Sequence, residues 1–135
     1  ELNDETLYME RGAYLCHVGN IETSATWEGF SGTFAEGMFG LRVSGTGLLF
    51  FGSYGDIQEV EVNGSYTVDN GYAVAWEQNL DYSIGRSGRS IRSFLFSDQL
   101  ICHFHGNGKL WVQTRSPRNL AAWVHPFRRV KSKND

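Results

Sequence analysis

The sequence predicts an all-β fold, a closed or rolled β-barrel built from two internal repeats, with one short C-terminal helix. Residues 39–51 match residues 100–112 at a constant offset of 61, so that Gly45 falls on Gly106. In both segments apolar and polar residues alternate, which is typical of half-buried strands. The chain also contains 16 Gly and 14% aromatic residues. Such a composition favours strands and turns.

Each matching segment is predicted to be a β-hairpin. A tight turn at two glycines, Gly45 and Gly47 in the first copy, would supply the positive φ that tight hairpin turns require. Val43 and its counterpart Phe104 fall on the apolar side of their strands. We expect both side chains to face a shared interior, so that an Asp in place of Phe104 would unfold the domain.

The similarity extends beyond the hairpins and organises the chain. Residues 10–17 match residues 69–76 at an offset of 59. A connection that is two residues longer in the second copy explains the later offset of 61, and surface loops tolerate such insertions. We therefore expect one barrel domain over residues 1–127, with repeat one at 1–60 and repeat two at 61–117.

Asn63-Gly64-Ser65 matches a glycosylation sequence, but a type I′ hairpin turn explains it better. The strand before this turn has no counterpart ahead of Glu1. The opening strand should therefore lack its partner. We expect the sequence to be the C-terminal part of a longer protein, and a native mass of 15.2 kDa would refute this.

One helix is predicted, over residues 117–124. Ser116 suits the N-cap and Pro117 suits the first helical position. Leu120 and Trp123 share a face of this helix, and we expect them to cover one end of the barrel. Residues 128–135 form a basic tail without periodicity, which we expect to be frayed.

Charge is unevenly distributed along the chain. Residues 1–85 hold 13 acidic and 2 basic side chains (net −11), and residues 86–135 hold 10 basic and 2 acidic ones (net +8). Either the halves neutralise each other in the fold, or the second half binds anions.

The sequence shows no apolar run near the roughly 18 residues of a membrane span, and no signal peptide is visible. Cys16 and Cys102 lie far apart, outside any C-x-x-C spacing. We expect free thiols in a reducing compartment, and therefore a cytoplasmic location.

No catalytic motif is complete, so we do not expect an enzyme. Gly45-Thr46-Gly47 is not a dinucleotide loop, because Phe50 stands where such a loop needs Gly. The sequence has no G-K-[ST] and no G-x-S-x-G. Glu59 and Glu61 share a strand face, where carboxylates usually face solvent.

His103 and His105 have the spacing of two metal ligands on one strand face. Such sites normally add a carboxylate and another His. No Glu follows Glu77, and Cys102 falls on the opposite face. We expect two imidazoles on a partly solvated face, without a metal or other cofactor.

Arg86, Arg89 and Arg92 lie three apart in a Gly/Ser-rich loop that could wrap a phosphate backbone or an anionic head group. The same half of the chain contributes more arginines and two possible stacking platforms, which are Arg115, Arg118, Arg128, Arg129, Trp111 and Trp123. The alternative is a solvated loop beside core tryptophans.

Two motifs resemble a known family. They are residues 68–77 followed by Asp81-Tyr82, and residues 106–108 running into residues 113–117. The chain resembles the altered inheritance of mitochondria family (number twenty-four), grouped with proteins similar in fold to the tryptophan RNA-binding attenuator. The resemblance implies a double-stranded β-helix, a homo-oligomer and a longer parent protein. It implies no catalytic residues.

Bacterial members of this family are of unknown function, and fungal members are linked to mitochondrial inner-membrane organisation. The resemblance therefore implies a mitochondrial location if the source is eukaryotic. Our leading hypothesis is a non-enzymatic, self-assembling β-barrel module that binds partners or acts as a scaffold. The alternative is an RNA- or anionic-ligand-binding protein that uses the basic C-terminal half.

Overall fold

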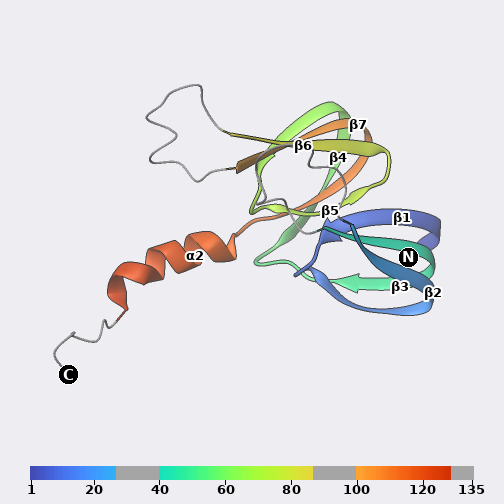
Figure 1. Cartoon of the computed structure of the whole chain (residues 1–135), viewed down its shortest axis with the longest axis horizontal. Helices are drawn as coiled ribbons and strands as arrows, with labels where there is room; N and C mark the ends of the chain where they lie inside the picture. Colours follow the sequence, from blue (N-terminus) through green and yellow to red (C-terminus); the bar gives the residue numbers. More distant parts are fainter. Residues whose placement is uncertain (27–39, 87–99, 129–135) are drawn as a thin grey trace.

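The structure is a computed structural model that describes residues 1–26, 40–86 and 100–128 (Figure 1). An all-β fold with a short C-terminal helix is confirmed. The described elements are β1 (Leu2–Glu10), β2 (Tyr14–Thr26), β3 (Gly40–Phe51), β4 (Ile57–Asp69), β5 (Ala73–Glu77), β6 (Leu80–Arg86), β7 (Leu100–Gln113), α2 (Pro117–Val124) and η1 (His125–Phe127).

The strands pair antiparallel in the order β2-β3-β1-β5-β7-β4, and β6 pairs with β7 outside this path. We call β1–β3 the first half of the fold and β4–β7 the second half. In the first half β3 lies between β1 and β2. In the second half β7 lies between β4 on one side and β5 with β6 on the other. The pairing of β1 with β5 joins the two halves (Figure 1).

The register of the two halves corresponds. Val43 pairs with Leu7 in the first half, and Phe104 pairs with Tyr66 in the second. Phe104 lies 61 residues after Val43, and Tyr66 lies 59 residues after Leu7. These separations equal the two offsets found in the sequence.

The predicted glycine hairpins are wrong. Gly45 and Gly47 lie inside β3, which pairs with β2 along its whole length, and Gly106 lies inside β7. Gly45 has φ +133° and Gly106 has φ +127°, so the glycines do adopt conformations that other residues avoid. A Cβ at Gly45 would overlap the carbonyl oxygen of Asn20. The glycines therefore let neighbouring strands approach closely within long strands and do not reverse the chain.

The hairpin turn predicted at Asn63-Gly64 is wrong for the same reason. β4 continues through both residues, and Asn63 pairs with Asn107 on β7. Gly64 has φ +101°, which a turn would also use, so the sequence signal was ambiguous. The prediction that the opening strand lacks a partner is wrong as well, because β1 pairs with both β3 and β5.

Two clusters of buried side chains form the core, one centred on each half, and Ala75 of β5 joins the cluster of the first half. Both side chains are fully buried as predicted, but Val43 belongs to the first cluster and Phe104 to the second, so the predicted shared interior is wrong. Trp76 stands edge-on to Phe104, with ring centroids 5.4 Å apart. Within the described residues its buried Nε1 has no acceptor. Such a donor costs about 1–3 kcal/mol.

The helix begins where the sequence predicts, but it does not cover the strands. Ser116 occupies the N-cap and Pro117 opens α2, although the Ser116 hydroxyl makes no capping bond. No residue of α2 or η1 is buried. Figure 1 shows α2 leading away from the strands. The predicted cover by Leu120 and Trp123 is therefore wrong, because periodicity identifies an apolar face but not what packs against it.

Candidate functional site

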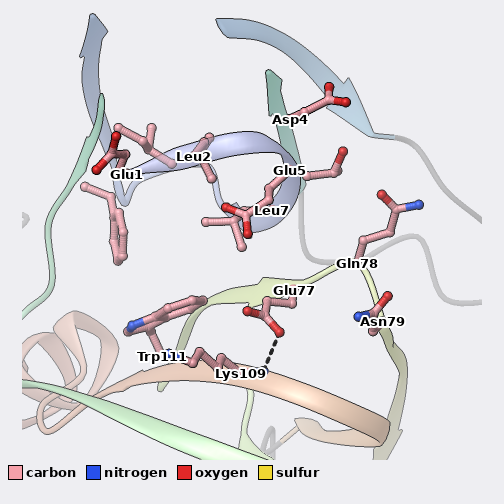
Figure 2. A pocket seen from close by; sticks show the side chains of 13 residues that line it. Glu1, Leu2, Asp4, Glu5, Leu7, Glu77, Gln78, Asn79, Lys109 and Trp111 are labelled. Atoms are coloured by element: carbon pink, nitrogen blue, oxygen red, sulfur yellow. Dashed lines mark hydrogen bonds between the residues drawn. The ribbon is translucent and has the colours of Figure 1, made fainter. Parts of the chain in front are cut away.

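A cleft of about 620 Å³ opens where the two halves meet (Figure 2). β1 and the end of β3 form one wall, and the β5–β6 turn with β7 forms the other. The lining residues are apolar on the floor and mostly acidic or amide-bearing on the rim. They are Glu1, Leu2, Asp4, Glu5, Thr6, Leu7, Leu49, Phe51, Glu77, Gln78, Asn79, Lys109 and Trp111.

The floor of the cleft is built from the ends of the two central strands. Phe51 at the end of β3 meets the edge of Trp111 on β7, with ring centroids 6.1 Å apart and planes at 76°. Leu2 and Leu7 of β1 are buried beside them. Aromatic rings in edge contact hold each other in place, which gives the floor a fixed apolar shape.

Asp4 and Glu5 form the acidic rim contributed by β1. The register of β1 against β3 shifts between Asn3 and Glu5, and Asp4 has φ +59° at this bulge. The Asp4 N–H donates to Thr46 Oγ1 at 3.1 Å, and the Asp4 side chain is exposed. Bulges reorient side chains in this way.

Glu77 supplies the carboxylate of the opposite wall. Its Oε2 accepts a hydrogen bond from the Lys109 backbone N–H at 3.0 Å (Figure 2). The Lys109 ammonium forms an ion pair with Glu59, Nζ to Oε1 2.8 Å. The hydrogen bond and charge of Glu59 raise the pKa of Lys109. Lys109 is therefore held by a carboxylate outside the cleft lining, and within the described residues no ion pair engages Glu77.

An apolar floor beneath a carboxylate rim suits a partner that is both cationic and apolar. Sequence reasoning did not find this cleft, because it depends on the pairing of β1 with β5 across the two halves. Glu5 and Glu77 lie far apart in the sequence, and no motif links them. The acidic excess of residues 1–85 was the only sequence signal of this surface.

The two candidate metal ligands lie on β7, on the face opposite Cys102 as predicted. His103 is half-buried, and its Nδ1 lies 3.1 Å from Thr67 Oγ1, whereas His105 is exposed. Within the residues that the structure describes, no group of three or more His, Cys, Asp or Glu side chains is placed to hold a metal ion.

Only part of the predicted anion-binding set lies within the described structure. Arg115, Arg118 and Arg128 are exposed at or near α2 and η1. Arg89, Arg92, Arg129 and the side chain of Arg86 lie outside the described residues. The two candidate stacking platforms are on different features, since Trp111 lines the cleft and Trp123 projects from α2. Glu59 and Glu61 are exposed, as expected for a solvated face.

Both cysteines are free, as predicted, but their surroundings differ. Cys16 is exposed and Cys102 is fully buried. Burial raises the pKa of the Cys102 thiol to about 12, and the nearby charge of Asp69 adds to this shift. The Cys102 Sγ donates to Asn70 Oδ1 at 3.5 Å.

Comparison with known proteins identifies the family. The family model described as Mitochondrial biogenesis AIM24 matches residues 1–115. The chain belongs to the AIM24 family. This result confirms the resemblance seen in the sequence motifs.

Two matches illustrate how this AIM24 chain relates to known proteins. An uncharacterised protein of Streptococcus pyogenes serotype M6 is 28% identical over 131 residues, covering 94% of the chain and 53% of the relative. The crystal structure of a protein from Streptococcus pyogenes aligns with TM-score 0.79 at 23% identity, covering 94% of the chain and 57% of that protein. The second match shows a shared fold. The chain spans about half the length of both proteins.

Within the described residues, no helix has the length and apolar character needed to cross a bilayer.

Proposed function

We propose that this AIM24-family chain is a non-enzymatic, self-assembling binding or scaffold module. The observation that carries the proposal is the exposed apolar face of α2 and η1. Leu120, Trp123, Val124 and Phe127 follow the i, i+3, i+4, i+7 spacing of one helix face. They are 44%, 68%, 44% and 73% exposed. Monomeric proteins rarely leave a contiguous apolar face uncovered.

A second exposed surface supports the same proposal. Val18 and Leu48 are direct partners across β2 and β3, and both side chains are exposed. Phe50 and Leu15 nearby are exposed as well. β2 spans 13 residues and lies at one end of the strand order. Long edge strands with apolar neighbours are sites at which chains associate.

The proposal includes a double-stranded β-helix built from two copies of one unit, in which β5 and β6 together take the place of β2. Support comes from the matching order and register of the halves, in which the last strand of each half is central. Enzymatic activity is not part of the proposal, because the sequence has no complete catalytic motif. We also propose a cytoplasmic location in a bacterial source, since both matched proteins come from Streptococcus pyogenes.

Sedimentation velocity at several protein concentrations tests self-assembly. We expect a species whose mass is a multiple of 15.2 kDa at micromolar concentration. A single 15.2 kDa species across the concentration range would refute the proposal.

A second candidate function is binding of RNA or another anionic ligand. It is favoured by the exposed Arg115, Arg118 and Arg128, and by the absence of acidic residues between Asp98 and Asp135 in the sequence. RNA binding of this kind should weaken by about 0.7 log unit per contacted phosphate for each log unit of added salt. Failure to bind single-stranded RNA at low salt would exclude it.

A further inference from the structure

We propose that α2 and η1 of one copy dock into the acidic cleft of a second copy. This inference rests on the self-assembly proposed above and names the two surfaces that make the contact. The helix supplies an apolar face flanked by arginines, and the cleft supplies an apolar floor beneath a carboxylate rim.

The helix side of the contact is a compact aromatic anchor. The rings of Trp123 and Phe127 lie 5.6 Å apart, centroid to centroid, and both side chains are more than two-thirds exposed (68% and 73%). Arg118 precedes them in the helix and Arg128 follows η1 directly. Tryptophan and arginine are the residue types most often found at the energetic centre of protein interfaces.

The cleft side matches this anchor in chemistry. Phe51 and Trp111 offer an apolar floor, and Glu5 and Glu77 add carboxylates to the lining. The volume of about 620 Å³ lies within the range of roughly 300–1,000 Å³ that binding pockets have. An amphipathic helix that inserts its apolar face into a groove is an established mode of recognition.

The partner is a second copy because the helix of the same chain is directed elsewhere. α2 leads away from the strands (Figure 1), and none of its residues is buried. Its tether to the sheet includes a hydrogen bond from Asn119 Nδ2 to the Tyr72 hydroxyl, 2.7 Å, and neither residue lines the cleft.

Charge also favours a second copy over other partners. Arg118 and Arg128 are exposed beside the apolar helix face, and Glu5 and Glu77 line the cleft, so the contact between helix and cleft is attractive. RNA or an anionic lipid surface would engage the arginines but would leave the acidic cleft without a partner. A second copy satisfies both surfaces.

The described part of each copy presents the α2–η1 segment and the cleft once each. Two copies can exchange helices reciprocally, or several copies can join head to tail in a closed ring. In both arrangements every helix is buried and every cleft is filled, so the assembly has a defined size.

The first test compares self-association of single variants by sedimentation. Trp123→Ser and Phe127→Ser should each raise the dissociation constant by about 30-fold, as for a central aromatic contact. Ile57→Thr is the matched control, because Ile57 is 40% exposed on β4 and does not line the cleft. Its dissociation constant should stay within about threefold of wild type. Unchanged association of both helix variants would overturn the inference.

The second test is cross-linking between copies. Chains carrying Trp123→Cys are mixed with chains carrying Glu5→Cys, both with Cys16→Ser to remove the exposed thiol, and are then oxidised. A disulfide-linked pair should form between the two variants. The control replaces Glu5→Cys with Glu22→Cys, an exposed position on β2 outside the cleft, and should give no such pair.

The outcomes separate this inference from the proposed function. Monomeric wild-type chain would refute self-assembly and the docking contact together. Persistent assembly without the Glu5 cross-link would refute the docking contact alone. If monomeric wild-type chain binds vesicles containing phosphatidylserine and Trp123→Ser abolishes this binding, the helix contacts lipid and the second-copy assignment is wrong. A Trp123-to-Glu5 cross-link with loss of assembly in Trp123→Ser confirms the docking contact.

Discussion

Tyr8 of β1 pairs directly with Trp76 of β5, and their rings stack with centroids 6.2 Å apart. Only three residue pairs make up the β1–β5 ladder, and this is the central one. Trp76 in turn contacts the ring of Phe104 in the second core cluster. Ring contacts from Tyr8 to Trp76 and from Trp76 to Phe104 therefore link the two halves of the sheet.

Truncation of Tyr8 should weaken the connection between the halves. Tyr8→Ala removes the ring from Trp76, and we expect the free energy of unfolding to fall by about 2–3 kcal/mol, less than for a fully buried aromatic residue. Tyr8→Phe keeps the ring and should cost less than about 1 kcal/mol. Urea unfolding measures both changes. Equal stability of the two variants would contradict this account of the junction.

Phe104 and His105 are neighbours on β7 with opposite environments. Phe104 is fully buried and His105 is exposed. Phe104→Asp places an unpaired carboxylate in the core and should unfold the chain, because the cost approaches the whole stability of a domain. His105→Asp faces Asp81 across β6 and β7 and should lower stability by no more than about 1 kcal/mol. Circular dichroism distinguishes the outcomes, and a folded Phe104→Asp variant would be inconsistent with the core described.

Gly45 and Gly64 both have positive φ, but only Gly45 is crowded. A Cβ at Gly64 meets nothing within 4 Å, whereas at Gly45 it would overlap the Asn20 carbonyl oxygen. Gly64→Ala should therefore cost about 1–2 kcal/mol from backbone strain alone. Gly45→Ala should cost more, because the β2 backbone must move. Thermal unfolding compares the stability of the two variants. Equal midpoints would show that the close approach of β2 and β3 at Gly45 does not require glycine.

The buried thiol of Cys102 should make stability depend on alkaline pH. Its pKa is raised from 9.0 to about 12 in the folded chain, so only the unfolded chain ionises between these values. Stability is then complete below pH 9 and falls by up to about 1.4 kcal/mol per pH unit above it. Cys102→Ala should show a smaller loss of unfolding free energy than wild type between pH 8 and 10 in urea titrations. If the unfolding free energies of Cys102→Ala and wild type fall in parallel with pH, ionisation of Cys102 is not the cause of the loss.

The sequence predicted the strands better than their connections. Alternation placed Val43 and Phe104 inside, because a strand sends successive side chains to opposite faces. The glycines at positions 45 and 64 misled the prediction, because positive φ serves a hairpin turn and a bend within a long strand equally well. Only the neighbouring backbone, such as the Asn20 carbonyl, distinguishes the two cases.

The candidate site was less accessible to sequence reasoning. The amphipathic spacing of Leu120 and Trp123 was visible, but the spacing alone did not show that this face is uncovered. The cleft joins Glu5 with Glu77 through a strand pairing that no local pattern encodes. Charge separation along the chain was the one sequence feature that pointed to both surfaces.

Self-assembly through complementary surfaces is the central claim, and native mass spectrometry of the purified chain tests it most directly. We predict a closed assembly whose mass is a whole-number multiple of 15.2 kDa and which dissociates in Trp123→Ser. A spectrum that contains only the 15.2 kDa chain at micromolar concentration would contradict the claim.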